Sequence, residues 1–184
     1  MVTDVNFTPG TIEIVSLAKA KKQLRLESTF IDEDDLILDY IDAAVVASEN
    51  FIGGHIQQKD MVIKMNQFDS PMEFEAFPMQ SITTVKYWPS DGGVEATLSN
   101  TLYKLTKLND KVFSLRFTND TPEIADRFDA VTVTVVVGNA INKTPKPIIQ
   151  SLLLQVADMY ERREDRTEVT GTTAMALLRP YKKY

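Results

Sequence analysis

Residues 32–54 read DEDDLILDYIDAAVVASENFIGG, and this segment decides the fold of the protein. Acidic side chains open the segment, and the unpaired N–H groups at a helix N-terminus favour negative charge there. Apolar side chains then recur every three or four residues for about four turns, and Gly53-Gly54 supplies the left-handed backbone that ends a helix. The segment therefore predicts a long amphipathic helix that buries one face.

Two further helices are predicted on either side of a long middle region. Ser16 is a good N-cap for a short amphipathic helix with a basic side. Towards the other end, Pro147 suits the first turn of a helix whose broad apolar face continues to Tyr160. Helices at residues 16–54 and 145–166 are therefore expected to pack together.

The middle of the chain changes from a helical to an alternating pattern. Met61, Ile63 and Met65 alternate with other residues, and similar runs continue to a β-branched stretch that ends at Gly138. We expect about six short antiparallel strands, with a meander as the simplest order. One more strand or extended arm is expected at residues 12–15.

These elements predict an α+β fold in a single domain over residues 1–184. The N- and C-terminal helices form a small helical bundle, and an antiparallel β-rich region is inserted between them at residues 56–140. A flexible link and a short apolar patch form a C-terminal tail at residues 167–184.

Composition excludes several classes of function. The formal charge of −6 argues against a general nucleic-acid binder, which needs a basic face. The chain has no cysteine and one histidine, His55, which leaves no thiolate chemistry and too few ligands for zinc. No stretch approaches the roughly 20 apolar residues of a membrane span, so we expect a soluble, intracellular protein with no membrane partner.

No side-chain pattern predicts catalysis. The sequence has neither a nucleophile elbow nor a phosphate-binding glycine loop. The acids at residues 32–35 are suitable ligands for a hard cation, but their place at a helix start already explains them. Glu73 and Glu75 fall on one solvent-facing side of a strand, without a predicted cleft. We expect no catalytic residue, no metal site and no cofactor.

Two apolar side chains do not fit the faces of their own helices. At about 100° per residue, Val46 and Leu154 point away from the apolar faces of the two long helices. Single exposed apolar residues are common on protein surfaces. The alternative is that these two side chains lie in a contact between subunits.

The start of the chain resembles a known family. Residues 15–26, VSLAKAKKQLRL, are followed by Asp34-Asp35-Leu36-Ile37 and then by an alanine-containing stretch, Ile41-Asp42-Ala43-Ala44. This order resembles the opening of the head-to-tail connector (adaptor) family of long-tailed bacteriophages, which begins Ser-Leu-x-x-x-Lys-x-x-Leu-Arg and continues with an Asp-Asp pair and an Ala-rich helix.

The end of the chain carries the same resemblance. Tyr160-Glu161-Arg162-Arg163 is similar to the Tyr-x-x-Arg signature of the closing helix of that family, and Leu177-Leu178-Arg179-Pro180-Tyr181 is similar to its Leu-Leu-x-Pro-Tyr tail. The resemblance covers both ends of the chain well and the β-rich middle poorly.

The resemblance implies a structural, non-enzymatic subunit of the virion neck, made in the host cytoplasm. Such subunits form a ring, commonly a dodecamer, under the portal protein, and extend the DNA channel between capsid and tail. The implied partners are other copies of the chain, the portal, the next neck or tail-completion protein, and double-stranded DNA that passes without sequence-specific binding. An acidic channel wall would suit DNA that must slide.

A closed ring uses heterologous contacts, so two different faces of each subunit must complement one another. Basic side chains of the first helix and acidic ones of the second could supply this complementarity. The candidate subunit-interface residues are Val46, Leu154, Asp39, Asp42, Lys19 and Lys22. The tail is a second candidate contact, with the portal or a neighbour, although it could equally fold back on its own domain. Its residues are Leu177, Leu178, Tyr181 and Tyr184.

Two other functions remain open from the residues alone. The β-rich middle could be a ligand- or carbohydrate-binding module of a phage particle, with Trp88, Tyr87 and Tyr103 lining a groove, although aromatic residues at strand ends more often complete a core. An enzyme that uses carboxylates and a metal would need an acidic cluster in a cleft.

Overall fold

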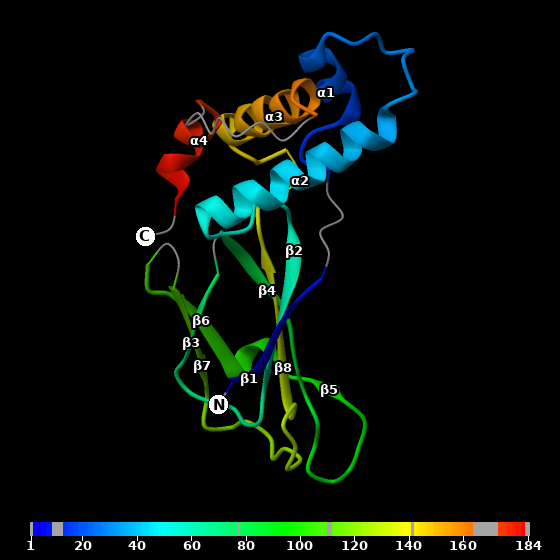
Figure 1. Ribbon diagram of the computed structural model, residues 1–184. Helices are drawn as coiled ribbons and strands as arrows, with labels where there is room; N and C mark the ends of the chain where they lie inside the picture. The colour runs from blue at the N-terminus through cyan, green and yellow to red at the C-terminus, as the bar shows by residue number, and fades with distance from the viewer. Residues whose placement is uncertain are drawn as a thin grey trace. The chain divides into compact units, whose positions relative to one another are not determined.

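The computed structural model describes residues 2–8, 13–76, 78–109, 112–140, 142–163 and 173–182. The chain divides into two compact units (Figure 1). The β unit consists of Met1–Thr11 and Gln58–Gly138, and the helical unit consists of Ile12–Gln57 and Asn139–Tyr184. The predicted α+β class is confirmed, since helices from both ends of the chain form one unit and every strand but the first lies between them in sequence.

The helical unit contains α1 (Leu17–Leu24), α2 (Asp34–Ile52), α3 (Lys146–Glu161), α4 (Thr173–Leu178) and a 3-10 turn at Arg179–Tyr181. Ser16 caps α1 as predicted, because its Oγ accepts a hydrogen bond from the backbone N–H of Lys19 at 3.3 Å. The apolar spacing of this helix continues to Leu26, but the helix ends at Leu24, since Arg25 takes a left-handed conformation with φ of 58°. Gly53, with φ of 70°, ends α2 as predicted.

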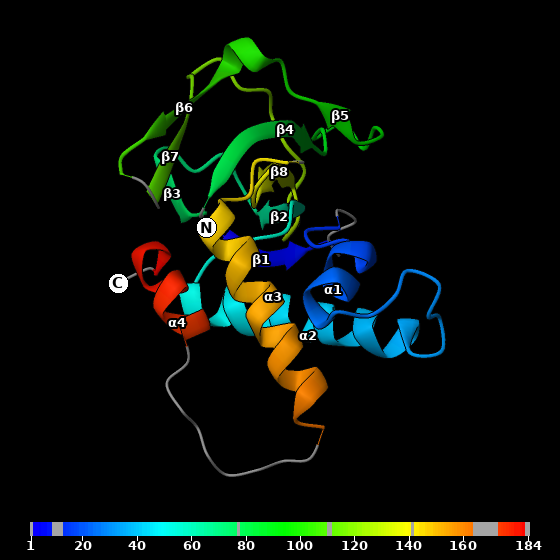
Figure 2. The ribbon, with the colours of Figure 1, turned by 90° about the horizontal axis from the view of Figure 1, so that it is seen from above.

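The core of the helical unit lies between α2 and α3. Figure 2 shows α3 crossing α2, with α1 and α4 on opposite sides of α3. The two helices bury apolar side chains at three- and four-residue spacing, namely Ile37, Ile41, Ala44, Val45 and Ile52 from α2 and Ile148, Leu152, Leu153 and Val156 from α3. This confirms the amphipathic faces that the sequence predicts.

A chain of polar side chains crosses this core. The amide Nε2 of Gln155 donates to the Oγ of Ser48 at 2.8 Å and to the Oγ of Ser151 at 3.2 Å. The Ser151 hydroxyl in turn donates to the carbonyl of Ala174 at 2.8 Å. Ser48 and Ser151 are fully buried, so these bonds satisfy groups that would otherwise be costly to bury. They link α2, α3 and α4.

The β unit contains β1 (Val2–Phe7), β2 (Lys59–Met65), β3 (Met72–Glu75), β4 (Met79–Tyr87), β5 (Ala96–Thr97), a 3-10 turn at Asn100–Leu102, β6 (Tyr103–Lys107), β7 (Val112–Phe117) and β8 (Val131–Val137). All pairings are antiparallel. One sheet has the order β1-β2-β8-β4-β5 and the other has the order β3-β7-β6 (Figures 1 and 2). The predicted meander is wrong, because β8 returns between β2 and β4 and β3 belongs to the second sheet.

The two sheets share one apolar core. Along β2 and β8, alternate side chains are buried, as the alternating pattern predicts. The residues of the first sheet that face this core include Met61, Ile63, Met65, Val85, Val131, Val133, Val135 and Val137, and those of the second include Met72, Phe74, Phe113, Leu115 and Phe117.

The N-terminal strand was missed by the sequence prediction. A strand or an extended arm was expected at residues 12–15, and the strand is wrong for residues 13–15, which the structure describes without one. The strand lies instead at Val2–Phe7, where every side chain is exposed and alternation therefore carries no signal of burial. It pairs with β2 and forms the outer edge of the first sheet.

Two of the three points where the chain passes between the units, those after Gln57 and before Asn139, are paired with each other. Gln57 and Asn139 form a parallel bridge, and both the backbone N–H and the side-chain amide of Asn139 donate to the carbonyl of Ile56, each at 3.1 Å. The carboxylate of Glu49 accepts hydrogen bonds from the N–H groups of Ile56 at 2.8 Å and Gln57 at 3.1 Å. The exit from the helical unit and the return to it are therefore held side by side.

Candidate interaction surfaces

No cluster of metal-binding side chains is present among the described residues, where no group of three or more His, Asp or Glu could hold an ion. Asp34 and Asp35 lie in the first turn of α2, as predicted for charges that complement a helix N-terminus. Glu73 and Glu75 are both exposed on β3, also as predicted. No helix in this part of the chain is long and apolar enough to cross a membrane.

The outer face of α2 combines acidic and apolar side chains. Val46 is 57% exposed, as its helical position predicts, and Leu38 is 41% exposed on the same helix. Asp39 and Asp42 are also exposed. Sequence reasoning missed Leu38, because three consecutive apolar residues at 36–38 hide which of them faces outward. We call Leu38, Asp39, Asp42 and Val46 the outer α2 face.

The basic side of α1 divides into exposed and buried lysines. Lys19 and Lys22 are exposed, so they are available to a partner. Lys21 is only 5% exposed, and its Nζ donates to the carbonyl of Phe30 at 2.7 Å and contacts the carboxylate of Asp34 at 2.5 Å. Lys21 therefore ties α1 to the start of α2 and takes no part in the outward charge.

Leu154, on α3, differs in surroundings from Val46. Its side chain is half-buried, whereas that of Val46 is exposed. The structure therefore leaves Val46 as the more accessible of the two candidate apolar contacts. Whether either side chain meets another subunit stays a prediction.

The C-terminal segment packs on its own unit over residues 173–182. Leu178 is fully buried and Ala174 is 3% exposed, while the Lys182 ammonium lies 5.1 Å from the centre of the Phe51 ring. Leu178 is thus occupied by its own bundle and is closed to a partner in this conformation. Leu177 and Tyr181 remain partly accessible, and Tyr184 lies outside the described residues.

The Tyr-x-x-Arg segment at the end of α3 holds the start of α2. The Tyr160 hydroxyl donates to one carboxylate oxygen of Glu33, the N-cap residue of α2, and Arg163 Nη2 donates to the other oxygen at 2.7 Å. The Arg163 guanidinium also lies 4.8 Å from the centre of the Tyr160 ring. The hydrogen bond from Tyr160, followed by that from Arg163, lowers the pKa of Glu33.

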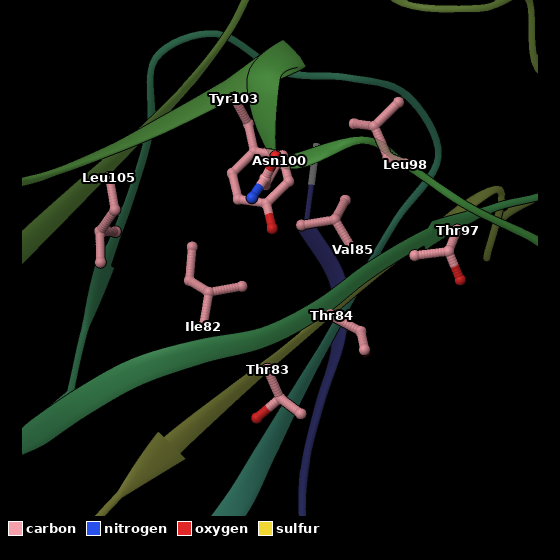
Figure 3. A pocket seen from close by; sticks show the side chains of 9 residues that line it. All are labelled: Ile82, Thr83, Thr84, Val85, Thr97, Leu98, Asn100, Tyr103 and Leu105. Atoms are coloured by element: carbon pink, nitrogen blue, oxygen red, sulfur yellow. The ribbon is translucent and has the colours of Figure 1, made fainter.

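An open groove lies in the β unit between β4 and β6, with a volume of about 490 Å³. Figure 3 shows Tyr103 and Leu105 on β6 pointing towards β4, from which Ile82 points back into the groove. The lining residues are Ile82, Thr83, Thr84, Val85, Thr97, Leu98, Asn100, Tyr103 and Leu105. Among the three aromatic residues suggested for a ligand groove, Tyr103 lines this one.

The other two aromatic residues have partners elsewhere. The Arg127 guanidinium lies 4.3 Å from the centre of the Trp88 ring and forms a bidentate ion pair with Asp129, at 2.5 and 2.9 Å. Tyr87 lies against Phe68, with ring centres 6.1 Å apart. The structure therefore does not bring Trp88 and Tyr87 into one groove with Tyr103.

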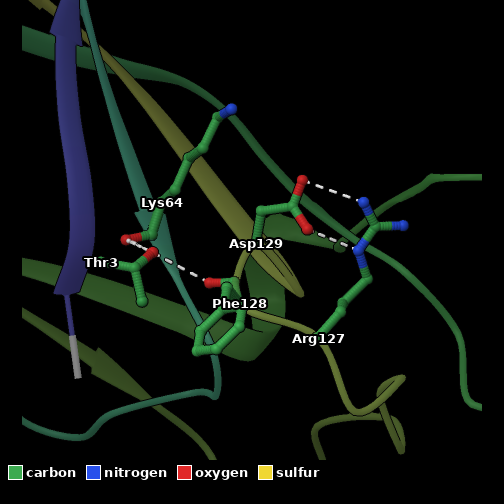
Figure 4. A network of polar contacts seen from close by, with 5 residues as sticks. All are labelled: Thr3, Lys64, Arg127, Phe128 and Asp129. Atoms are coloured by element: carbon green, nitrogen blue, oxygen red, sulfur yellow. Dashed lines mark hydrogen bonds and ion pairs between the residues drawn. The ribbon is translucent and has the colours of Figure 1, made fainter.

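The start of β1 is fastened beside this ion pair. Figure 4 shows the Thr3 hydroxyl between two backbone carbonyls, those of Phe128 at 2.9 Å and Lys64 at 3.1 Å. Further along, the N–H of Thr8 donates to the carbonyl of Asp60 at 2.9 Å, and the N–H of Asp60 donates to the Thr8 hydroxyl at 3.0 Å. Polar contacts thus hold both ends of this exposed strand.

Comparison with known proteins gives a match to one family model over part of the chain and a fold shared with solved structures. Residues 14–83 match the family model of phage gp6-like head-tail connector proteins. No curated protein matches the sequence.

Three solved structures share the fold over nearly the whole chain. A chain in the neck of an empty gene transfer agent (GTA) particle, computed with C6 symmetry, has a TM-score of 0.74 at 18% identity over 99% of this chain and 96% of that one. A chain in the virion of a native GTA particle gives the same values. A chain in the neck of a native GTA particle, computed with C12 symmetry, has a TM-score of 0.68 at 17% identity over 100% and 96%.

Proposed function

We propose that the protein is a non-enzymatic structural subunit of a virion neck, because residues 14–83 match the family model of phage gp6-like head-tail connector proteins. The family match carries this proposal. The likeness of fold to neck chains, which extends over 99% of the sequence, supports it for the β unit as well. The protein would then lie between the head and the tail of the particle.

The proposed assembly is a dodecameric ring under the portal, which extends the DNA channel towards the next neck or tail-completion protein. The GTA necks were computed with C6 and with C12 symmetry, and a ring of twelve copies satisfies both, since a twelvefold axis contains a sixfold one. A formal charge of −6 suits a channel through which DNA slides without being gripped.

The helical unit supplies complementary surfaces for such a ring. The outer α2 face carries exposed acids beside the exposed Val46 and Leu38, and α1 carries the exposed Lys19 and Lys22. In a heterologous contact, the outer α2 face of one copy would meet α1 of the next. Burial of the two apolar side chains would add affinity, and the charges would select the orientation.

The test is electron microscopy of the purified protein with its portal. We expect rings for the unchanged protein and for the exchange Asp42→Lys with Lys22→Glu, and loss of rings for each charge reversal alone. Both residues are exposed, so the fold should tolerate these changes within about 0.5 kcal/mol. A protein that stays monomeric with the portal present would contradict the proposal.

A ligand-binding module has one observation in its favour, the groove that Tyr103 lines. Since Trp88 and Tyr87 lie against Arg127 and Phe68, the aromatic platform that a carbohydrate site requires is not assembled there. The connector function therefore explains more of the molecule.

A further inference from the structure

The five-stranded sheet has an open stretch of backbone along β4. β5 pairs with β4 only at Lys86 and Tyr87, and one more bond joins the N–H of Leu98 to the carbonyl of Val85 at 2.8 Å. Within the described part of the chain, residues 79–84 of β4 have β8 on one side and no strand on the other. An uncovered edge offers N–H and carbonyl groups to another extended segment.

The groove runs beside this open stretch and is lined by apolar side chains from both sheets. Ile82 and Val85 come from β4, and Tyr103 and Leu105 come from β6, which is an edge strand of the second sheet (Figure 3). Ile82, Tyr103 and Leu105 also pack against the core of the β unit. A strand added along β4 could therefore bury its own apolar side chains under β6.

The opposite edge of the same sheet presents a strand of matching chemistry. On β1, Val2, Val5 and Phe7 are 37%, 41% and 47% exposed. Val5 pairs with Ile63, which pairs with Val133, which in turn pairs with Val85. Paired residues point to the same face of a sheet. The apolar side chains of β1 therefore lie on the core-facing side of the first sheet, at an edge where they stay exposed. Val5 is at one end of this row of side chains, and Val85, which lines the groove, is at the other.

Strand direction is also compatible with joining the two edges. All neighbours in the order β1-β2-β8-β4 are antiparallel, so β4 runs opposite to β1. When a second copy is placed beside the first in the same orientation, its β1 is antiparallel to β4 of the first. The contact joins two unlike surfaces, as a ring of identical subunits requires.

We propose that, in the assembled ring, β1 of one copy pairs antiparallel with residues 79–84 of β4 in the next copy and places Val5 and Phe7 in the groove between β4 and β6. This inference rests on the proposed function and assigns the β unit a part in joining subunits. The partner is a second copy of this chain. β5 limits the pairing to the part of β4 before Lys86.

Engineered disulfides test this contact, and the chain contains no cysteine of its own. Asn6→Cys is combined in one chain with either Ser81→Cys or Thr84→Cys. The strand pairing places these three residues on the side of the sheet that faces away from the core. Within one copy these strands are three spacings apart, about 14 Å, which is too far for a disulfide. The matched control pairs Asn6→Cys with Glu73→Cys on β3, the other edge of the second sheet.

Rings assembled on the portal are oxidised and run on a non-reducing gel. We expect a ladder of covalent oligomers from at least one of the two test pairs, none from the control pair, and none from Asn6→Cys alone. Mixing two single variants, Asn6→Cys and Ser81→Cys or Thr84→Cys, should stop the ladder at dimers. Dimers from Asn6→Cys alone would show a symmetric contact between two β1 strands and overturn the inference.

Electron microscopy of the same samples separates the two proposals. Intact rings without a ladder from either test pair would overturn the strand contact and leave the connector function standing. Absence of rings in the unchanged protein with its portal would overturn both. As a second variant, Val5→Asp places a charge on an exposed strand and should remove the ladder while leaving the melting temperature of the monomer unchanged.

Discussion

At the scale of single residues, Lys21 shows how a basic helix can contain a buried charge. Its ammonium group bonds with the Phe30 carbonyl and the Asp34 carboxylate, so it joins two segments that are adjacent in sequence. Lys21 recurs at helical spacing with the apolar Leu17, Ala20 and Leu24, and as a lysine it was also predicted to lie on the basic side of the helix. Its partner Asp34 belongs to the acidic run at the start of α2, and the spacing of apolar residues contains no information about that pairing.

Lys21→Met should destabilise the protein by about 1–3 kcal/mol, because the Phe30 carbonyl and the Asp34 carboxylate lose their partner. Lys22→Met, at the exposed neighbouring position, should change the free energy of unfolding by about 0.5 kcal/mol or less. Urea denaturation measures both. Equal effects of the two substitutions would show that the buried ion pair adds nothing.

The carboxyl group of Glu33 makes the stability of the helical unit depend on pH. Because its hydrogen bonds with Tyr160 and Arg163 lower its pKa in the folded protein, folding favours the ionised form. The stabilisation is therefore complete above the pKa of the unfolded state and is lost as pH falls through the folded value.

We expect Glu33→Gln to lower the melting temperature above about pH 5, where an ordinary glutamate is ionised. The difference from the unchanged protein should narrow as the pH falls further. Tyr160→Phe should show the same trend, since it removes the largest cause of the pKa shift. A difference that stays constant from neutral pH to below pH 4 would contradict this account.

At the scale of elements, the sequence correctly predicted the helices and strands that are marked by periodic apolar residues or by capping residues. α2 begins at the acidic run and ends at Gly53, and the successive strands β6 and β7 pair as they would in the predicted meander. The order of the strands could not be predicted this way, because alternation shows that a strand has one buried face and says nothing of its neighbours. β1 was missed because none of its side chains is buried.

The C-terminal segment shows a similar limit. Leu177 and Leu178 are adjacent residues of the same type, yet only Leu178 is fully buried. Leu178→Ala should cost about 2–5 kcal/mol, because it leaves a cavity between α4 and the rest of the helical unit. Leu177→Ala is the matched control and should cost clearly less. Thermal unfolding followed by circular dichroism distinguishes them.

The burial of Leu178 determines how a docking role of the C-terminal segment should be tested. Removing residues 174–184 would also remove Leu178 from its own core, so lost assembly could follow from lost stability. Substitutions at Leu177 and Tyr181, which are partly accessible, keep the core intact. Their effect on binding to the portal stays a prediction.

At the scale of the whole molecule, the paired crossing points predict that the helical unit can fold alone. Gln57 and Asn139 are already bridged, so a short glycine linker can replace everything between them without forcing the ends apart. A chain of residues 12–57 joined to 139–184 should give a helical circular dichroism spectrum and a cooperative melt. A non-cooperative melt would show that the helical unit depends on the β unit.

The candidate contacts were only partly predictable at this scale. Val46 was found because a helix has a fixed angle per residue, and the structure shows it exposed. Of the three aromatic residues predicted for a possible ligand groove, Tyr103 lines the groove between β4 and β6, whereas Trp88 and Tyr87 lie against Arg127 and Phe68. The part played by residues 82–85 could not be predicted, because their composition is that of an ordinary strand.

The proposed contact between two different edges of the first sheet, β1 and β4, also affects how the purified protein assembles in solution. A contact between unlike surfaces closes into a ring only when the rotation from one copy to the next is right, and otherwise it grows into an open filament. The formal charge of −6 keeps free copies apart at low ionic strength, and salt screens this repulsion. Concentrated protein without its portal should therefore form fibres first in high salt, and the portal would act as the template that turns fibre growth into ring closure.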